Sequence, residues 1–407
     1  MMKILKQNSQ TIQKLYERNL YARKKHIEER VRRIIDDVRL SGDEALVKYT
    51  RRFDKAKLTT RQLRVEEGEI SGSFQNITSD FVATLKFIIH NVEIFYRKQL
   101  KKPARIKNAE GILLKENIQP LESVGIYIPA GTAPLVSTVY MTVIPAKVAG
   151  VKRIVIATPP DKDGHINPYI LAVASLLKVN EIYKVGGAQA IAALSFGTKT
   201  ISRVDKMIGP GNMYVTEAKR QLFGYVDIDM LAGPTEVAII ANRFSNPEYV
   251  IADLEAQMEH AGGLAVLITN SKQLIRQVKK RVSGGYVILV KNIDEAVNIV
   301  NQIAPEHLEI LTNNPLSIAK KITNAAAIFL GPYSPAAVGD YVAGPSHVLP
   351  TLGTARFFSG LCLSDFTKTS HIISYSKKAL EKVKEPLEKI ATLEGLTKHT
   401  ESVKVRF

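Results

Sequence analysis

From about residue 111, short apolar runs alternate with helical segments, and this alternation restricts the fold more than any other feature. The runs that we predict to be strands are residues 123–128, 153–158, 182–185, 205–208, 237–241, 265–269, 286–290 and 325–330. Segments between them, such as 168–178 and 188–196, have helical spacing. Such alternation predicts parallel or mixed sheets with right-handed crossovers. For 407 residues, two α/β domains fit better than one.

The two ends of the chain have a different pattern. Apolar residues recur at helical spacing in residues 27–53 and 78–99, where Thr78 or Ser79 is the expected N-cap. The tail, residues 367–407, is charged and is predicted to be helical, ending in a strand-like Ser-Val-Lys-Val-Arg-Phe. We therefore expect helical extensions at both ends.

Composition excludes several classes of protein. With Cys362 as its one cysteine, the chain cannot form an internal disulfide, a zinc site of several cysteines or a CxxC redox pair. Residues 1–25 lack the apolar segment of a signal peptide. The uncharged stretch 123–146 is interrupted by prolines, so we predict a buried strand, a loop and a helix there rather than a membrane span. We expect a soluble, cytoplasmic protein with no membrane partner.

The net charge of +17 raises the question of nucleic acid, which basic proteins often bind. The excess is spread along the chain. Residues 1–33 are basic, but apolar residues recur among them at helical spacing, which indicates solvated basic faces. There is no RGG tract and no basic patch with interleaved aromatic residues, so we expect no nucleic-acid partner. A basic binding protein without catalysis remains an alternative.

The common nucleotide-binding and hydrolase fingerprints are missing from the sequence. There is no GxGxxG after a strand, no GxxxxGK[ST], no HExxH and no GxSxG. The segment Gly209-Pro210-Gly211-Asn212 has two suitably spaced glycines, but Tyr214 occupies the place of the third. A dinucleotide, if bound here, does not use the usual glycine-rich turn.

Residues 246–263 form a well-marked helix with Asn246 as N-cap and Pro247 at its first position. Gln257 and His260 are three residues apart and share a face, so together they could hold a metal ion. The alternative is a histidine favoured at a helix end by the macrodipole alone.

Two further segments could carry chemistry. Residues 304–309, Ala-Pro-Glu-His-Leu-Glu, are predicted to open a helix whose dipole lowers the pKa of His307, with Glu306 as a second base. A solvated first turn is the alternative.

Residues 339–351 form a predicted loop rich in Gly and Pro that contains Asp340 and His347, and functional side chains often lie on such loops. An ordinary turn aspartate is the alternative there.

Together these segments resemble the histidinol dehydrogenase family. The resemblance covers roughly residues 20–407 and includes VGIYIPAGTAPLVSTV (124–139), VGGAQAIAALSFGT (185–198), DKMIGPGNMYVTEAKR (205–220), LAGPTEVAII (231–240), QMEH (257–260), APEHLE (304–309), GDYVAGPSHVLPT (339–351) and EGLTKH (394–399). It implies zinc-dependent, NAD-linked oxidation of L-histidinol to L-histidine. An alternative is a related dehydrogenase for another amino or hydroxy alcohol.

The resemblance also implies roles for individual residues. One zinc ion per subunit would be held by Gln257, His260, Asp340 and His399, and Glu306 and His307 would be the catalytic bases. The residues expected to contact NAD are Tyr127, Gln189 and Asn212. Those expected to contact the substrate are Thr235, Gln257, His260, His307, Asp340, His347, Glu394 and His399.

The expected organisation follows the same resemblance. We expect two α/β domains with incomplete Rossmann-like sheets, parallel or mixed, and tail residues that reach the partner subunit of a homodimer with shared active sites. The expected divisions are an N-terminal helical extension (1–23), a main α/β domain with the metal and catalytic residues (24–126 and 235–360), an NAD-binding α/β domain (127–234) and the tail (361–407). Departures from the family pattern are Ala130, Thr235, Ser346 and Ala261-Gly262-Gly263. None of them removes a ligand or a base.

Overall fold

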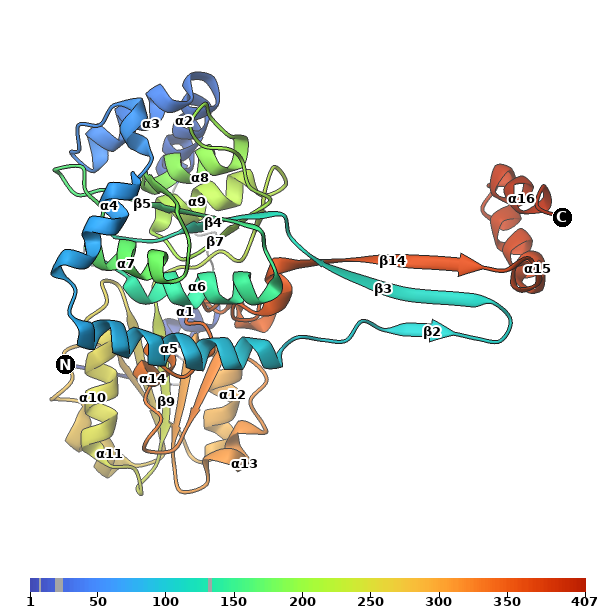
Figure 1. Ribbon diagram of the computed structural model, residues 1–407. Coiled ribbons are helices and arrows are strands. Elements are labelled where there is room, and N and C mark those ends of the chain that lie inside the picture. Colours follow the sequence, from blue (N-terminus) through green and yellow to red (C-terminus); the bar gives the residue numbers. More distant parts are fainter. Residues whose placement is uncertain (7–8, 19–24, 131–133) are drawn as a thin grey trace. The chain divides into compact units, whose positions relative to one another are not determined.

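The computed structural model describes residues 1–6, 9–18, 25–130 and 134–407 (Figure 1). Residues 7–8, 19–24 and 131–133, which include parts of the expected N-terminal extension and of the 124–139 motif, lie outside the described part. The chain divides into two units. The first comprises Met1–Lys98 and Leu121–Phe366, and the second comprises Gln99–Pro120 and Thr367–Phe407.

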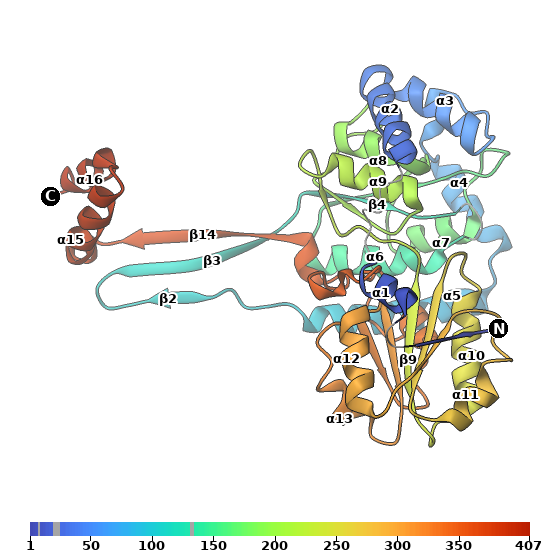
Figure 2. The same cartoon turned by 180° about the vertical axis from the view of Figure 1, so that it is seen from behind.

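The first unit contains a six-stranded parallel sheet in the order β1-β11-β10-β9-β12-β13. Its strands are β1 (Lys3–Leu5), β9 (Glu236–Ala241), β10 (Leu264–Thr269), β11 (Tyr286–Leu289), β12 (His307–Leu311) and β13 (Ala327–Leu330). One face packs against α10 (Pro247–Met258) and α11 (Lys272–Val278), and the other against α1 (Gln10–Tyr16), α12 (Ile293–Ile303) and α13 (Pro315–Ala319) (Figure 2). Because helices cover both faces, β9 is buried along its length.

The same unit contains a five-stranded parallel sheet in the order β6-β5-β4-β7-β8. Its strands are β4 (Ser123–Tyr127), β5 (Arg153–Thr158), β6 (Glu181–Lys184), β7 (Lys206–Ile208) and β8 (Asp227–Ile228). One face packs against α4 (Glu67–Gly72), α5 (Ser79–Lys98), α6 (Val136–Ala149) and α7 (Pro168–Leu176). The other packs against α2 (Lys25–Ser41), α3 (Asp43–Phe53), α8 (Gly187–Phe196) and α9 (Met213–Leu222).

The second unit pairs segments that are far apart in the sequence. Strand β3 (Ile112–Pro120) lies antiparallel between β2 (Arg105–Lys107) and β14 (Thr367–Tyr375). Two helices follow, α15 (Lys377–Leu393) and α16 (Thr397–Lys404), and they contact each other.

The predicted fold class is confirmed: two parallel sheets lie among helices, and each predicted strand has an observed counterpart that differs only at its ends. Within the described residues, no helix combines the length and apolarity needed to cross a bilayer. The uncharged 123–146 stretch instead supplies β4 and α6.

Four local predictions are wrong. Residues 307–311 form strand β12 instead of a helix. Helix α12 ends at Ile303, Ala304 follows it with a φ of 49°, and the next segment inserts between β9 and β13. Residues 367–375 form β14 through pairing with β3, and the chain end forms α16 instead of a strand. The predicted loop containing Asp340 begins inside helix α14 (Ala336–Tyr341).

The expected domain division stays a prediction, and the packing groups some residues differently. Helices α2 and α3 contact α8 and α9, and β4 lies at the centre of the five-stranded sheet, although both segments were expected in the main domain. The tail was expected to comprise residues 361–407. The second unit instead starts at Thr367 in this part of the chain, and it also includes Gln99–Pro120.

Candidate active site

The two predicted bases lie together at the amino end of strand β12, beside the start of the neighbouring strand β9. Strand β9 begins at Glu236 and β12 begins at His307, which is in register with Val237. Thr235 and Glu306 immediately precede these strands. Parallel pairing therefore brings two polar segments, about 70 positions apart in the chain, to one edge of the six-stranded sheet.

Glu306 is buried, and two donors hold its carboxylate. Thr235 Oγ1 donates to Glu306 Oε2 at 2.6 Å, and the backbone N–H of Glu236 donates to the same oxygen at 2.8 Å. Burial raises the pKa of Glu306 to about 7, because the carboxylate loses its hydration there. A carboxyl group that titrates near neutrality is suited to act as a general base.

His307 is also buried, and its two ring nitrogens have different partners. Nδ1 lies 3.1 Å from the carbonyl oxygen of Glu236, which can only accept, so this nitrogen carries a proton. Nε2 lies 3.4 Å from Asp340 Oδ1, too far for a strong hydrogen bond. Neutral His307 therefore presents the lone pair of Nε2 toward the Asp340 side.

The charge environment of His307 differs from the sequence prediction. Burial lowers its pKa, but the carboxylates of Glu306 and Asp340 outweigh burial and raise it to about 9. The sequence predicts a lowered pKa for His307 from a helix N-terminus. That prediction is wrong because His307 begins a strand, where there is no helix dipole.

Asp340 and His347, from the segment 339–351, lie close together. Asp340 is on α14, and its carbonyl oxygen lies 2.9 Å from His347 Nδ1. The other ring nitrogen, Nε2, lies 3.2 Å from Thr138 Oγ1 on α6. The carbonyl again assigns the proton to Nδ1, so the ring orientation of His347 is fixed beside Asp340.

Gln257 and His260 lie at the end of α10, which begins with the predicted Asn246 cap and Pro247. Gln257 is buried and its Nε2 has no hydrogen-bond partner in the described part of the chain, whereas His260 is exposed. The backbone then turns at Gly262, with a φ of 77°. A Cβ on Gly263 would lie 3.0 Å from Gln257 Nε2 and 2.7 Å from its carbonyl oxygen, so the Ala-Gly-Gly sequence allows this close turn.

This turn returns the chain to the edge of the six-stranded sheet where Thr235 and Glu306 lie. The N–H of Leu264 donates to the carbonyl oxygen of Thr235 at 3.0 Å, directly before Glu236. Thr235, in turn, binds Glu306 through its hydroxyl group. The end of α10 therefore neighbours the segment that holds Glu306.

No group of three or more His, Cys, Asp or Glu side chains is placed to hold a metal ion among residues 1–6, 9–18, 25–130 and 134–407. The predicted zinc ligands differ from such a group in two ways. One of them, Gln257, is an amide and not a His, Cys, Asp or Glu, and another, His399, belongs to the second unit.

Two predicted site residues, Glu394 and His399, lie in the second unit. Glu394 caps the end of α15 and His399 is on α16, and both are exposed. Helices α15 and α16 contact each other. Within that unit, no other predicted site residue accompanies them.

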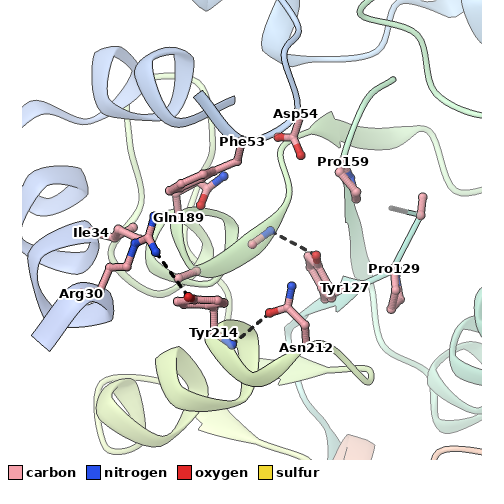
Figure 3. A pocket seen from close by; sticks show the side chains of 13 residues that line it. Arg30, Ile34, Phe53, Asp54, Tyr127, Pro129, Pro159, Gln189, Asn212 and Tyr214 are labelled. Carbon is pink, nitrogen blue, oxygen red and sulfur yellow. Dashed lines mark hydrogen bonds between the residues drawn. The ribbon is translucent and has the colours of Figure 1, made fainter. Parts of the chain in front are cut away.

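A cavity of about 470 Å³ lies at the carboxyl edge of the five-stranded sheet (Figure 3). It is at the ends of β4 and β7, between which the strand order reverses, and this is where open parallel sheets bind ligands. The residues that line it are Arg30, Ile34, Phe53, Asp54, Tyr127, Pro129, Ala130, Pro159, Gly187, Ala188, Gln189, Asn212 and Tyr214. Its volume is in the range of small-molecule and cofactor sites.

The structure brings Tyr127, Gln189 and Asn212 together in this cavity (Figure 3). The N–H of Gly187 donates to the hydroxyl oxygen of Tyr127 at 3.1 Å. Asn212 Oδ1 caps α9 by accepting from the N–H of Tyr214 at 2.9 Å, which fixes the side chain at the cavity wall. Gln189 Oε1 is buried without a partner in the described residues.

Sequence reasoning missed four other polar or aromatic residues of this cavity. The guanidinium carbon of Arg30 lies 5.8 Å from the ring centre of Phe53 and 5.5 Å from that of Tyr214. Burial raises the pKa of Asp54 to about 6. Tyr214 stands where a GxGxxG motif would have its third glycine. That position in the sequence was the only signal that could have identified Tyr214 as a cavity residue. Arg30, Phe53 and Asp54 come from α2 and from the end of α3, so no motif marked them.

A buried ion pair holds the loop between β7 and α9. Lys219 pairs with Asp229, and Lys219 Nζ also donates to the carbonyl oxygen of Gly209 at 3.0 Å. The N–H of Gly209 donates to Asp229 Oδ2 at 2.7 Å. Gly209 has a φ of 116°, and a Cβ there would collide with the carbonyl oxygen of Tyr127. The loop before Asn212 is therefore fixed from both sides.

We expect Lys219→Met to destabilise the chain and to weaken binding of a ligand in this cavity. The substitution leaves Asp229 buried without its cation, which typically lowers the free energy of unfolding by about 3–5 kcal/mol. Urea denaturation and NAD titration would measure the two effects. The matched control is Lys389→Met, which breaks the exposed pair with Glu385 and should change neither. Unchanged stability of Lys219→Met would contradict the role of the pair.

Comparisons with known proteins show the family to which the chain belongs. The family model described as histidinol dehydrogenase matches residues 18–407. Histidinol dehydrogenase of Clostridium acetobutylicum is 47% identical over 396 residues, covering 93% of this chain and 91% of that protein. The Listeria monocytogenes enzyme is 44% identical over 400 residues, covering 94% and 93%. The crystal structure of histidinol dehydrogenase from Elizabethkingia anophelis superposes with a TM-score of 0.93 at 37% identity, covering 100% of this chain and 97% of that one. The chain therefore belongs to the histidinol dehydrogenase family, and it is an oxidoreductase of histidine biosynthesis.

Proposed function

We propose that the chain oxidises L-histidinol to L-histidine through L-histidinal, in two hydride transfers to NAD, with one zinc ion per subunit. The observation that carries the proposal is the buried pair Glu306 and His307, both held by the backbone of Glu236. The two oxidations need one base for the hydroxyl protons and one for water, and the pair can supply both.

In the first oxidation, His307 accepts the hydroxyl proton at Nε2 while the alcohol carbon loses a hydride, which gives the aldehyde. The bond from Nδ1 to the Glu236 carbonyl oxygen fixes the tautomer that leaves Nε2 available. Proton removal and hydride departure are thereby coupled at a ring whose orientation the strand backbone fixes.

In the second oxidation, Glu306 accepts a proton from water as the water oxygen bonds to the aldehyde carbon. His307 first releases the proton from the first oxidation to solvent. The hydrate anion then gives its O–H proton to His307 and loses a second hydride, forming the carboxylate. Both fixing bonds on Glu306 end on Oε2, from Thr235 and from the backbone of Glu236, so they leave Oε1 unused. A pKa of about 7 suits this exchange of protons with water.

The proposed NAD site is the cavity at the carboxyl edge of the five-stranded sheet, with Tyr127, Gln189 and Asn212 as contacts. When bound, NAD would accept the hydride. Two observations support the fit: the position at the reversal of strand order and the unpartnered, buried Gln189 Oε1.

The proposed zinc ligands are Gln257, His260, Asp340 and His399. The fit rests on the donor set of one amide, two imidazoles and one carboxylate, and on the buried Gln257 amide, whose Nε2 has no hydrogen-bond partner among the described residues. When bound, zinc would orient the imidazole and amine of the substrate. Its positive charge would also offset that of Asp340, and this would lower the pKa of His307. The proposed substrate contacts are Thr235, Gln257, His260, His307, Asp340, His347, Glu394 and His399.

We further propose a homodimer in which Glu394 and His399 serve the site of the partner subunit. Mixing inactive His260→Ala and His399→Ala subunits should then restore part of the activity, since one mixed site keeps every ligand. Steady-state NADH formation after verified subunit exchange is the measurement. No recovery despite exchange would argue for sites built from one chain. Cytoplasmic location and the absence of nucleic-acid partners stay predictions.

The decisive test combines zinc content with the yield of NADH per L-histidinol in the purified protein. The proposal expects one zinc per subunit and two NADH per histidinol, because both oxidations occur on one enzyme. A yield of one NADH would reject the second oxidation. Turnover of a different alcohol with no turnover of histidinol would reject the substrate.

A further inference from the structure

Among the described residues, Glu236 is the one whose backbone groups hydrogen-bond with the side chains of both proposed bases. Its N–H donates to Glu306 Oε2 at 2.8 Å, and its carbonyl oxygen lies 3.1 Å from His307 Nδ1. The orientation of both bases therefore depends on how the backbone of Glu236 is held.

The side chain of Glu236 is buried, with 2% of its surface exposed. Its Oε1 accepts from Arg18 Nη1 at 2.5 Å and from the N–H of Leu352 at 2.8 Å. Oε2 has no hydrogen-bond partner in the described residues. A carboxylate in this position needs its cation, because burial strongly disfavours an unpaired charge.

Arg18 is anchored in turn, and it comes from a distant part of the sequence. Its side chain is 12% exposed. Nε donates to the carbonyl oxygen of Leu15 at 2.9 Å, and Nη2 donates to that of Ile303 at 3.0 Å. The guanidinium fork thus joins the end of α1, the end of α12 and the start of β9.

We infer that Arg18 and Glu236 form a positioning pair that orients Glu306 and His307 through the backbone of Glu236. The inference rests on the proposed function and adds to it a role for the segment that follows α1. Neither residue lines the proposed NAD cavity, so the pair acts on catalysis and not on cofactor binding.

The test compares Arg18→Met, Arg18→Lys, Glu236→Gln and the double variant Arg18→Met/Glu236→Gln. The matched control is Arg97→Met, which breaks an exposed arginine–glutamate pair on α5. For each variant, kcat and KM are measured with L-histidinol and with L-histidinal, together with KM for NAD and thermal stability.

Arg18→Met should lower kcat about 10- to 100-fold on both substrates, the usual cost of losing a residue that supports catalytic groups, with little change in KM for NAD. Arg18→Lys should have a kcat between those of Arg18→Met and the unmodified chain. Lysine keeps the positive charge but lacks the planar guanidinium with its several fixed N–H donors. The double variant should exceed Arg18→Met in kcat, because it no longer buries an unpaired carboxylate. The control should match the unmodified chain.

An unchanged kcat in Arg18→Met would overturn the positioning role while leaving the proposed function intact. The positioning role would also be overturned if the loss of kcat across the variants simply paralleled their loss of thermal stability. If Arg18→Met does not fold, Glu236→Gln provides the same test: it keeps the side-chain shape, and the inference expects a lower kcat at unchanged KM for NAD. An unmodified chain that does not oxidise L-histidinol would reject the proposed function, and the inference with it.

Discussion

Replacing Glu306 with Gln should spare the oxidation of L-histidinol to L-histidinal and slow the oxidation of L-histidinal by about 10²- to 10⁴-fold, the usual contribution of a general base. The amide keeps the shape of the side chain and can still accept from Thr235 and from the backbone of Glu236. It cannot take a proton from water. Single-turnover NADH formation from each substrate separates the two steps.

The same role predicts a pH dependence. Glu306 acts as a base only when ionised, and its pKa is raised to about 7 by burial. Oxidation of L-histidinal should therefore rise as the pH passes upward through about 7, and Glu306→Gln should remove this rise. Glu93→Gln, an exposed glutamate on α5, is the matched control and should behave as the unmodified chain. Equal loss of both oxidations in Glu306→Gln would contradict a role confined to water.

Asp340→Ala should release zinc and lower activity to near the background rate. The substitution removes the proposed carboxylate ligand and also the anion 3.4 Å from His307 Nε2. It keeps the backbone carbonyl oxygen that accepts from His347 Nδ1, so the helix and the loop should survive. Zinc per subunit after gel filtration, circular dichroism and NADH formation are the measurements.

The control for this experiment is Asp294→Ala, which removes an exposed aspartate paired with Lys321. It should keep zinc and activity, since the pair is exposed to solvent and neither residue is a proposed ligand. Stoichiometric zinc in an inactive Asp340→Ala variant would remove Asp340 from the ligand set and leave it only a role beside His307.

Much of the fold could be predicted because its signals are local. Short apolar runs between helical segments identified most strands of both sheets, although not β1, β8 or β12. Helix caps fixed boundaries such as the start of α10 at Asn246 and Pro247. The segment 304–309 was assigned wrongly because Pro305 after α12 looks like a helix start. Hydrogen bonds on both edges of β12, from β9 and β13, decided the outcome instead.

The sequence by itself determined the apolar periodicity that builds two parallel sheets and the polar motifs that supply the proposed bases, ligands and cofactor contacts. Only the tertiary structure decided that Glu306 and His307 share the backbone of Glu236, that Arg18 supports that residue, and that helices α2 and α3 help to enclose the cavity. The physical reason is distance along the chain. Local propensity depends on neighbours within a few residues, whereas these contacts join segments up to 218 positions apart and form only when burial of the sheets brings them together.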